Sequence, residues 1–135
     1  MKPAHMTVFD AIKPERGNCM FAAVASILEI PVASIPDDPD DVWEQRYEML
    51  TRWLNDRNLY PLRLIYDAKP PGWSIGVIRS HIYPDIFHAV VCRDGRAIFD
   101  PLPKGASQFG YDYKDIVEYT VLVPLNPAKP SGSVD

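Results

Sequence analysis

The chain has 135 residues, of which 47% are hydrophobic and 24% charged, a composition typical of one globular domain that buries its own core. Its net charge of -4 argues against a nucleic-acid partner, and its two cysteines and three histidines show no metal-ligand spacing. The longest apolar run, residues 20–28, is too short to span a bilayer, and no export signal precedes it. We therefore expect a cytoplasmic protein with reduced thiols that needs neither metal nor cofactor and does not bind a membrane.

The first helix is expected to begin after Gly17-Asn18. The Asn18 side chain is a good N-cap because its oxygen can accept a backbone N–H of the first turn. The residues from Cys19 to Glu29 are apolar on almost every side, which predicts a helix that is buried on most of its surface and that ends before Pro31.

A second helix is predicted from Asp41 to about Asn55. Asp41 followed by Glu44 has the spacing of a capping box at the start of a helix. Large apolar side chains then recur at spacings of four, three and four, which is typical of an amphipathic helix. These residues are Trp43, Tyr47, Leu50 and Leu54.

The second half of the chain reads as strands. Alternation after Pro61 predicts a strand over residues 62–67, and further strands are expected over 88–92, 96–100 and 119–125. Residues 73–79 fit either a strand or a short helix. Helices followed by a mostly antiparallel sheet indicate an α+β fold. We expect one domain over residues 1–125 and a flexible tail over 126–135, which is rich in Pro, Gly and Ser.

Cys19 is the candidate nucleophile because it lies in the first turn of the predicted buried helix. The helix dipole and the free N–H groups of that turn favour a thiolate, and the same N–H groups can donate to an oxyanion. The alternative is an inert thiol, since free cysteine is among the residues most often buried.

The hairpin around Arg93-Asp94-Gly95 decides whether His88 can meet Asp100. A three-residue loop makes these two residues direct cross-strand neighbours on one face of the sheet. A two-residue Asp94-Gly95 turn places them on opposite faces unless a bulge compensates. In the first case the carboxylate orients the imidazole. The alternative for the hairpin as a whole is that His88 simply begins a strand and Asp100 simply ends one.

These segments together resemble papain-like cysteine peptidases, most of all the compact bacterial and phage-type domains similar to the peptidase C39 group. The resemblance rests on Gly17-Asn18-Cys19 before an Ala-rich helix, on His88-Ala89-Val90-Val91 and on Phe99-Asp100-Pro101. It implies a papain-like fold in which the helix carrying the cysteine packs on the sheet. It also implies that Cys19, His88 and Asp100 cleave an amide or isopeptide bond through an acyl-enzyme.

One position departs from that family. The family often has a Gln six residues before the nucleophile that completes the oxyanion hole, and this chain has Lys13 there. Asn18 or Lys13 is then the candidate second donor to an oxyanion, beside the N–H of Cys19.

Other residues carry weaker expectations. Trp73 and Tyr83 are candidates for the wall of a substrate cleft, and His81 is a rival base. Cys92, in a Val-rich strand, is expected to be structural.

A peptide or protein is the expected substrate, and either hydrolysis or acyl transfer would complete the reaction. One alternative is a papain-like domain that has lost activity and binds a peptide, a partner protein or a small molecule. The other is a purely structural protein with two slow thiols.

Overall fold

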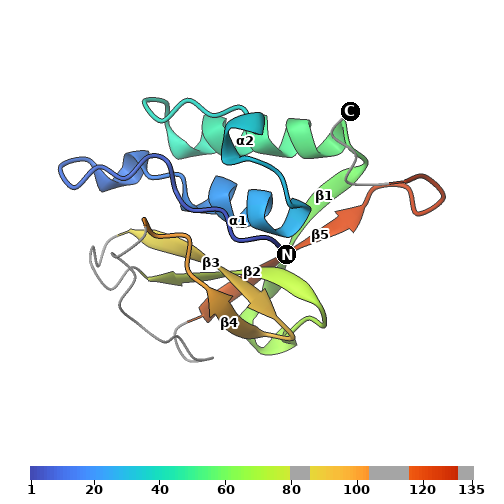
Figure 1. Ribbon diagram of the computed structural model, residues 1–135. Coiled ribbons are helices and arrows are strands. Elements are labelled where there is room, and N and C mark those ends of the chain that lie inside the picture. The colour runs from blue at the N-terminus through green and yellow to red at the C-terminus, as the bar shows by residue number, and fades with distance from the viewer. Residues whose placement is uncertain (80–85, 104–115, 131–135) are drawn as a thin grey trace.

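The protein places two helices on one face of a five-stranded antiparallel sheet (Figure 1). The computed structural model describes residues 1–79, 86–103 and 116–130. The helices are α1 (Cys19–Leu28) and α2 (Trp43–Asn55), and three short 3-10 turns are η1 (Pro14–Arg16), η2 (Val32–Ser34) and η3 (Tyr66–Ala68). The strands are β1 (Leu59–Ile65), β2 (Trp73–Arg79), β3 (Phe87–Arg93), β4 (Arg96–Phe99) and β5 (Ile116–Pro124). The predicted α+β class, with helices before strands, is confirmed.

Helix α1 lies between the sheet and the rest of the helical layer, as its apolar sequence predicts. Phe21 and the alanines that follow it are fully buried, and the short alanine side chains let α1 approach β3 and β2 closely. The helix ends at Glu29, whose positive φ of 58° reverses the chain before Pro31.

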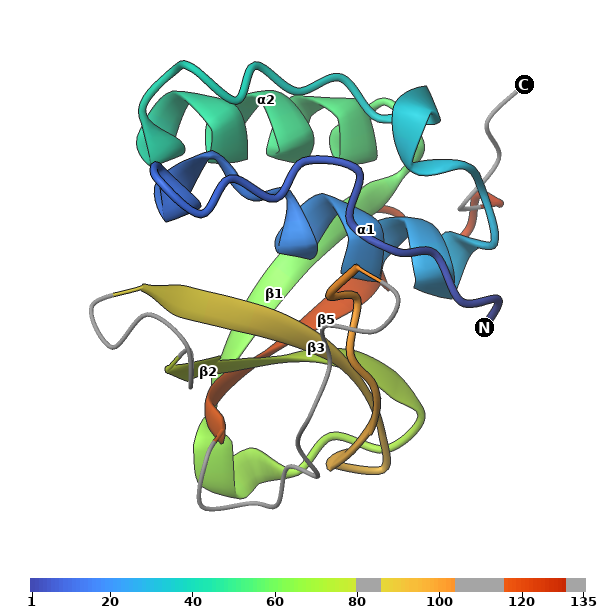
Figure 2. The same ribbon diagram turned by 60° about the vertical axis from the view of Figure 1, so that its left-hand side comes forward.

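Helix α2 starts at Trp43 and covers β1 (Figures 1 and 2). The capping box predicted at Asp41 and Glu44 was wrong, because Val42 precedes the helix and makes no side-chain cap. Asp41 instead accepts the N–H of Val42 at 2.8 Å. The apolar stripe is as expected, with Leu50 and Leu54 buried in the main core.

The strand order in the sheet is β1-β5-β2-β3-β4. Residues 73–79, for which the sequence left two possibilities, form β2, which pairs with β3 on one side and β5 on the other. A strand enclosed in this way is buried on both faces, so its sequence shows no polar alternation. Strand β1 begins at Leu59, earlier than expected. It tolerates Pro61 because it is an edge strand.

Apolar side chains gather on both faces of the sheet. The main core lies between the sheet and α1 and α2, and it includes Ala89 and Val91 from β3. A smaller core on the opposite face includes Val90 and Cys92 from the same strand. No helix in the described part of the chain is long and apolar enough to cross a membrane.

The segment that follows β5 is joined to the turn before β1. The Asn58 side chain donates to the carbonyls of Asn126 (2.8 Å) and Lys129 (3.1 Å), and it accepts the N–H of Asn126 at 2.8 Å. The flexible tail predicted over 126–135 therefore begins with residues that are hydrogen-bonded to the domain, and 131–135 lie outside the described residues.

Candidate active site

The candidate site lies where α1 and β3 begin and where β4 ends (Figures 1 and 2). Cys19 is the first residue of α1 and is partly exposed, with neighbours in the main core. The backbone N–H of Ala89 in β3 donates to its Sγ at 3.4 Å. The thiol is thus held between the N-terminus of the helix and the first residues of the strand.

His88, the second residue of β3, is paired with Asp100 just beyond β4. The distance between His88 Nε2 and Asp100 Oδ1 is 2.6 Å, and both side chains are less than a tenth exposed. The same Oδ1 also accepts the N–H of Leu102 at 3.0 Å, which fixes the carboxylate relative to its own loop. Because Nε2 faces the carboxylate, Nδ1 is the imidazole nitrogen left for the thiol.

The hairpin brings His88 and Asp100 together with a turn that differs from the three-residue loop. Asp94 and Gly95, both with positive φ, form a two-residue turn in which Arg93 pairs with Arg96. The register then shifts, because Cys92 pairs with Ala97 but Val91 pairs with Phe99. Of the two alternatives, the three-residue loop is therefore excluded in favour of the two-residue turn, and Ile98 is an extra residue in β4.

This bulge restores the shared face that the two-residue turn would have lost, although not the direct cross-strand pairing of His88 with Asp100. Ala97 packs in the smaller core and Phe99 against the main core, although residues two apart share a face in a regular strand. Continuing the shifted register beyond Phe99 places Asp100 on the face of Val90 and hence of His88. The bulge is the compensation without which His88 and Asp100 would diverge.

The Cys19 thiol is more acidic than an ordinary thiol. Burial acts to raise its pKa. The hydrogen bond and charge of His88, together with the N–H groups of Ala89 and Met20, outweigh burial and lower the pKa overall. A lowered pKa favours the thiolate, which is the nucleophilic form.

The imidazole has the complementary property. Burial acts to lower the pKa of His88, but hydrogen bonds to Asp100 and Cys19 and the charges of both raise it to about 10. A raised imidazole pKa beside a lowered thiol pKa describes a thiolate–imidazolium pair around neutral pH.

Asn18 has a different role from the cap predicted for it. Its side chain makes no capping bond. Its Oδ1 accepts the N–H groups of Thr7 and Val8, each at 3.1 Å, while Nδ2 donates to Thr7 Oγ1 at 2.8 Å. Asn18 is 4% exposed, so it ties the N-terminal segment to the start of α1. The prediction of a side-chain cap was wrong, and the uncapped first-turn N–H groups, including that of Cys19, lie beside the thiol.

Lys13 and Trp73 lie away from the thiol. Lys13 is exposed, its N–H donates to Asp10 Oδ1 at 3.0 Å, and it does not line the pocket that contains Cys19. Trp73 begins β2 opposite Arg93, whose guanidinium lies 4.8 Å from its ring centre, at the end of the strand remote from His88. The structure therefore does not bring either residue together with Cys19. His81 and Tyr83 lie outside the described residues.

A pocket of about 580 Å³ opens at Cys19 and His88 between the helical layer and the sheet. Its walls are largely apolar, with Trp43 and Tyr47 from α2 facing Val77 and Val117 from the sheet. Glu15 and the Arg63–Glu118 ion pair (2.9 Å) add charge at its edge. The described residues thus place a thiol, an imidazole and an apolar cleft together.

The N-terminal segment supports the loop that carries Asp100, a role that sequence reasoning missed. His5 Nδ1 lies 2.8 Å from the carbonyl of Leu102, and the N–H of Met6 donates to the carbonyl of Pro101 at 2.7 Å. The sequence held no signal for this, because irregular segments far apart in the chain form these contacts.

Arg46 was also missed, although the sequence carried a signal for it. It lies three residues after Trp43 and four before Leu50, inside the apolar stripe of α2, and it is 1% exposed. A charged residue within a buried stripe needs a partner, which here is Asp37, whose Oδ1 lies 2.7 Å from the Arg46 Nε.

Among the described residues, no group of three or more His, Cys, Asp or Glu side chains is arranged to hold a metal ion. Comparison of the chain with models of protein families, with curated proteins and with solved structures finds no match.

Proposed function

We propose that this protein is a cysteine-dependent hydrolase of the peptidase or amidase type, with a papain-like fold, that cleaves an amide or isopeptide bond. The observation that carries the proposal is the connected set of Cys19, His88 and Asp100 at the mouth of an apolar pocket. A thiol paired with an imidazole, which is in turn oriented by a carboxylate, is the general arrangement of an activated nucleophile.

The reaction follows from the charges of that set. The Cys19 thiolate attacks the carbonyl carbon, and the resulting oxyanion receives the N–H of Cys19 at the uncapped start of α1. The tetrahedral intermediate collapses to a thioester as protonated His88 gives its proton to the leaving amine. Water then gives a proton to His88 as it attacks the thioester carbon. The carboxylic acid product is released, and the Cys19 thiolate and the His88 imidazolium are restored. Asp100 keeps the imidazole aligned throughout.

The formation of an acyl-enzyme can be tested with p-nitrophenyl acetate, because its product is coloured. We expect a burst of p-nitrophenolate equivalent to the enzyme and an acetyl group on Cys19, located by mass spectrometry of peptides. Cys19→Ala should give no burst, and Cys92→Ala, the matched control, should keep it. A burst that survives in Cys19→Ala would refute the proposal. Amide cleavage can then be sought with a mixed library of peptidyl-aminomethylcoumarins.

A second candidate is a binding module with the same cleft and little or no turnover. It is favoured because, among the described residues, neither of the two candidate side-chain donors to the oxyanion lines the pocket. Asn18 is hydrogen-bonded to Thr7 and Val8 instead, and Lys13 is exposed. Loss of one such donor lowers rates by about 10²–10³-fold in other enzymes. An acyl-enzyme that forms and is then hydrolysed at a rate lowered by that factor would identify a weak enzyme. A reactive Cys19 with no acyl-enzyme would identify the binding module.

A further inference from the structure

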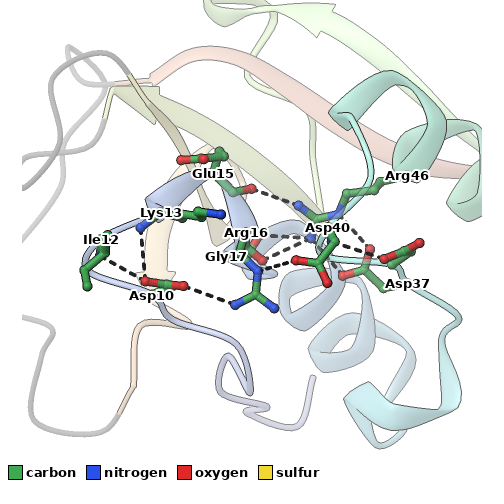
Figure 3. Close-up of polar contacts among 10 residues, drawn as sticks. Asp10, Ile12, Lys13, Glu15, Arg16, Gly17, Asp37, Asp40 and Arg46 are labelled. Carbon is green, nitrogen blue, oxygen red and sulfur yellow. Dashed lines mark hydrogen bonds and ion pairs between the residues drawn. The ribbon is translucent and has the colours of Figure 1, made fainter.

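The guanidinium of Arg46 is buried against the chain that leads into Cys19 (Figure 3). It donates to three consecutive backbone carbonyls, those of Glu15 (2.9 Å), Arg16 (3.4 Å) and Gly17 (3.1 Å). These carbonyls end two residues before the nucleophile. One side chain of α2 thus holds the whole approach to the first turn of α1.

Arg46 also donates to Asp37, through Nε and through Nη2, which is shared with the carbonyls of Arg16 and Gly17. Nε and Nη2 lie 2.7 Å and 2.8 Å from the two carboxylate oxygens, and the Asp37 side chain is 11% exposed. The rings of Phe21 and Trp43 lie 5.5 Å from the guanidinium carbon. Only a planar group with five N–H donors can satisfy a carboxylate and three carbonyls at once, so lysine cannot reproduce these contacts.

The segment held by Arg46 also forms part of the candidate site. Glu15 and Gly17 line the pocket, and a Cβ at Gly17 would lie 3.0 Å from the Met6 side chain, so the segment is tightly confined. On the solvent side of this segment, the Arg16 guanidinium forms ion pairs with Asp10 at 3.1 Å and with Asp40 at 2.8 Å. The Arg46–Asp37 pair is therefore hydrogen-bonded to the main chain just before Cys19 and restrains its position.

An ion pair that is largely withdrawn from water is seldom the most stable filling for a core, because apolar side chains of similar size avoid the desolvation cost. A role in fixing one geometry is then the more direct reason for its presence. The geometry it fixes here is the entry to α1, from which Cys19 presents both its Sγ and its N–H.

We infer that Arg46, held by Asp37, is a positioning residue for the nucleophile. It fixes the position of the backbone of residues 15–17 and thereby the distance and angle between the Cys19 thiol and the His88 imidazole. This inference rests on the proposed function, because it concerns the same thiol–imidazole pair.

The test is the pH dependence of iodoacetamide labelling at Cys19, followed by mass spectrometry, in Arg46→Lys and the wild type. We expect the Arg46→Lys chain to fold and its Cys19 titration to move toward that of an ordinary thiol, with labelling near pH 6 slower by roughly 10-fold. Arg52→Lys is the matched control. It changes an exposed arginine of the same helix, paired with Glu48 at 2.7 Å, and should leave labelling unchanged.

Asp37→Asn provides a second, milder variant. Asparagine offers one acceptor oxygen in place of two, so the guanidinium is held less firmly and the shift should have the same direction and a smaller size. If Arg46→Lys does not fold, Asp37→Asn alone decides the matter. Lower melting temperatures with an unchanged Cys19 titration in every folded variant would overturn the inference and leave a purely structural pair. Slow labelling of Cys19 in the wild type would instead refute the proposed function itself.

Discussion

The two cysteines of this protein lie in opposite kinds of environment. Cys19 begins a helix, is partly exposed, and faces His88 and the N–H of Ala89, so its pKa is lowered. Cys92 is fully buried near the end of β3, where burial raises its pKa to about 12, although the hydrogen bond with the N–H of Gly76 acts to lower that pKa. The difference indicates that the pKa of a thiol here depends on its place in the fold and on one imidazole partner, and we expect reactivity to follow the pKa.

The largest expected effect is on turnover. Cys19→Ala should lower the turnover of p-nitrophenyl acetate by at least about 10⁴-fold, because the nucleophile and base act as one unit. Cys92→Ala should leave it within about twofold, because Cys92 is remote from the pocket. Steady-state kinetics on the two purified variants, with circular dichroism to confirm folding, checks both. Equal losses of turnover in Cys19→Ala and Cys92→Ala would contradict the difference between the two cysteines.

Removing the imidazole should make the two thiols more alike. In His88→Ala the hydrogen bond and charge that lower the Cys19 pKa are gone, while burial still raises it. Labelling of Cys19 near pH 6 should therefore slow by roughly 10²-fold, and labelling of Cys92 should not change. Unchanged labelling of Cys19 would mean that the imidazole does not activate it.

We expect the carboxylate of Asp100 to set the upper end of the active pH range. Asp100→Asn removes the negative charge that helps to raise the pKa of His88 and leaves only a weaker hydrogen bond to a neutral amide oxygen, so the imidazolium loses its proton at lower pH. The alkaline limb of the profile of kcat/KM against pH should move to lower pH, and the maximum should fall by about 10²-fold. An alkaline limb that stays in place would mean that Asp100 does not hold the proton on His88.

The smallest effect concerns the surroundings of Cys92. A Cβ at Gly76 would lie 2.7 Å from its Sγ, so Gly76→Ala forces the small core apart. We expect a loss of about 1–3 kcal/mol in the free energy of unfolding, measured by urea denaturation. Cys19 labelling should stay at the wild-type rate, and a slower rate would show that the two regions are coupled.

The sequence predicted the elements that depend on local patterning. The helix at Cys19, the stripe of α2 and the strands around Cys92 follow from apolar periodicity and turn residues, which are encoded within short windows. The boundaries were less accurate, as the extra residues of β1 and the wrong capping box at Asp41 show.

The candidate site was predictable only in part, because its geometry depends on contacts between distant segments. The sequence brought forward Cys19, His88 and Asp100, but not the bulge at Ile98 that brings the last two to the same face. The engagement of Asn18 by residues 7 and 8 could not be predicted either, since an asparagine before a helix is usually its cap.

The most direct test of the account is the rate of iodoacetamide labelling at each cysteine of the wild-type protein, from about pH 4 to about pH 10. The account predicts that Cys19 reacts well below the pH at which an ordinary thiol ionises, and that Cys92 scarcely reacts until the protein unfolds. Two slow thiols with the same pH dependence would contradict it, because no thiolate–imidazolium pair would then exist.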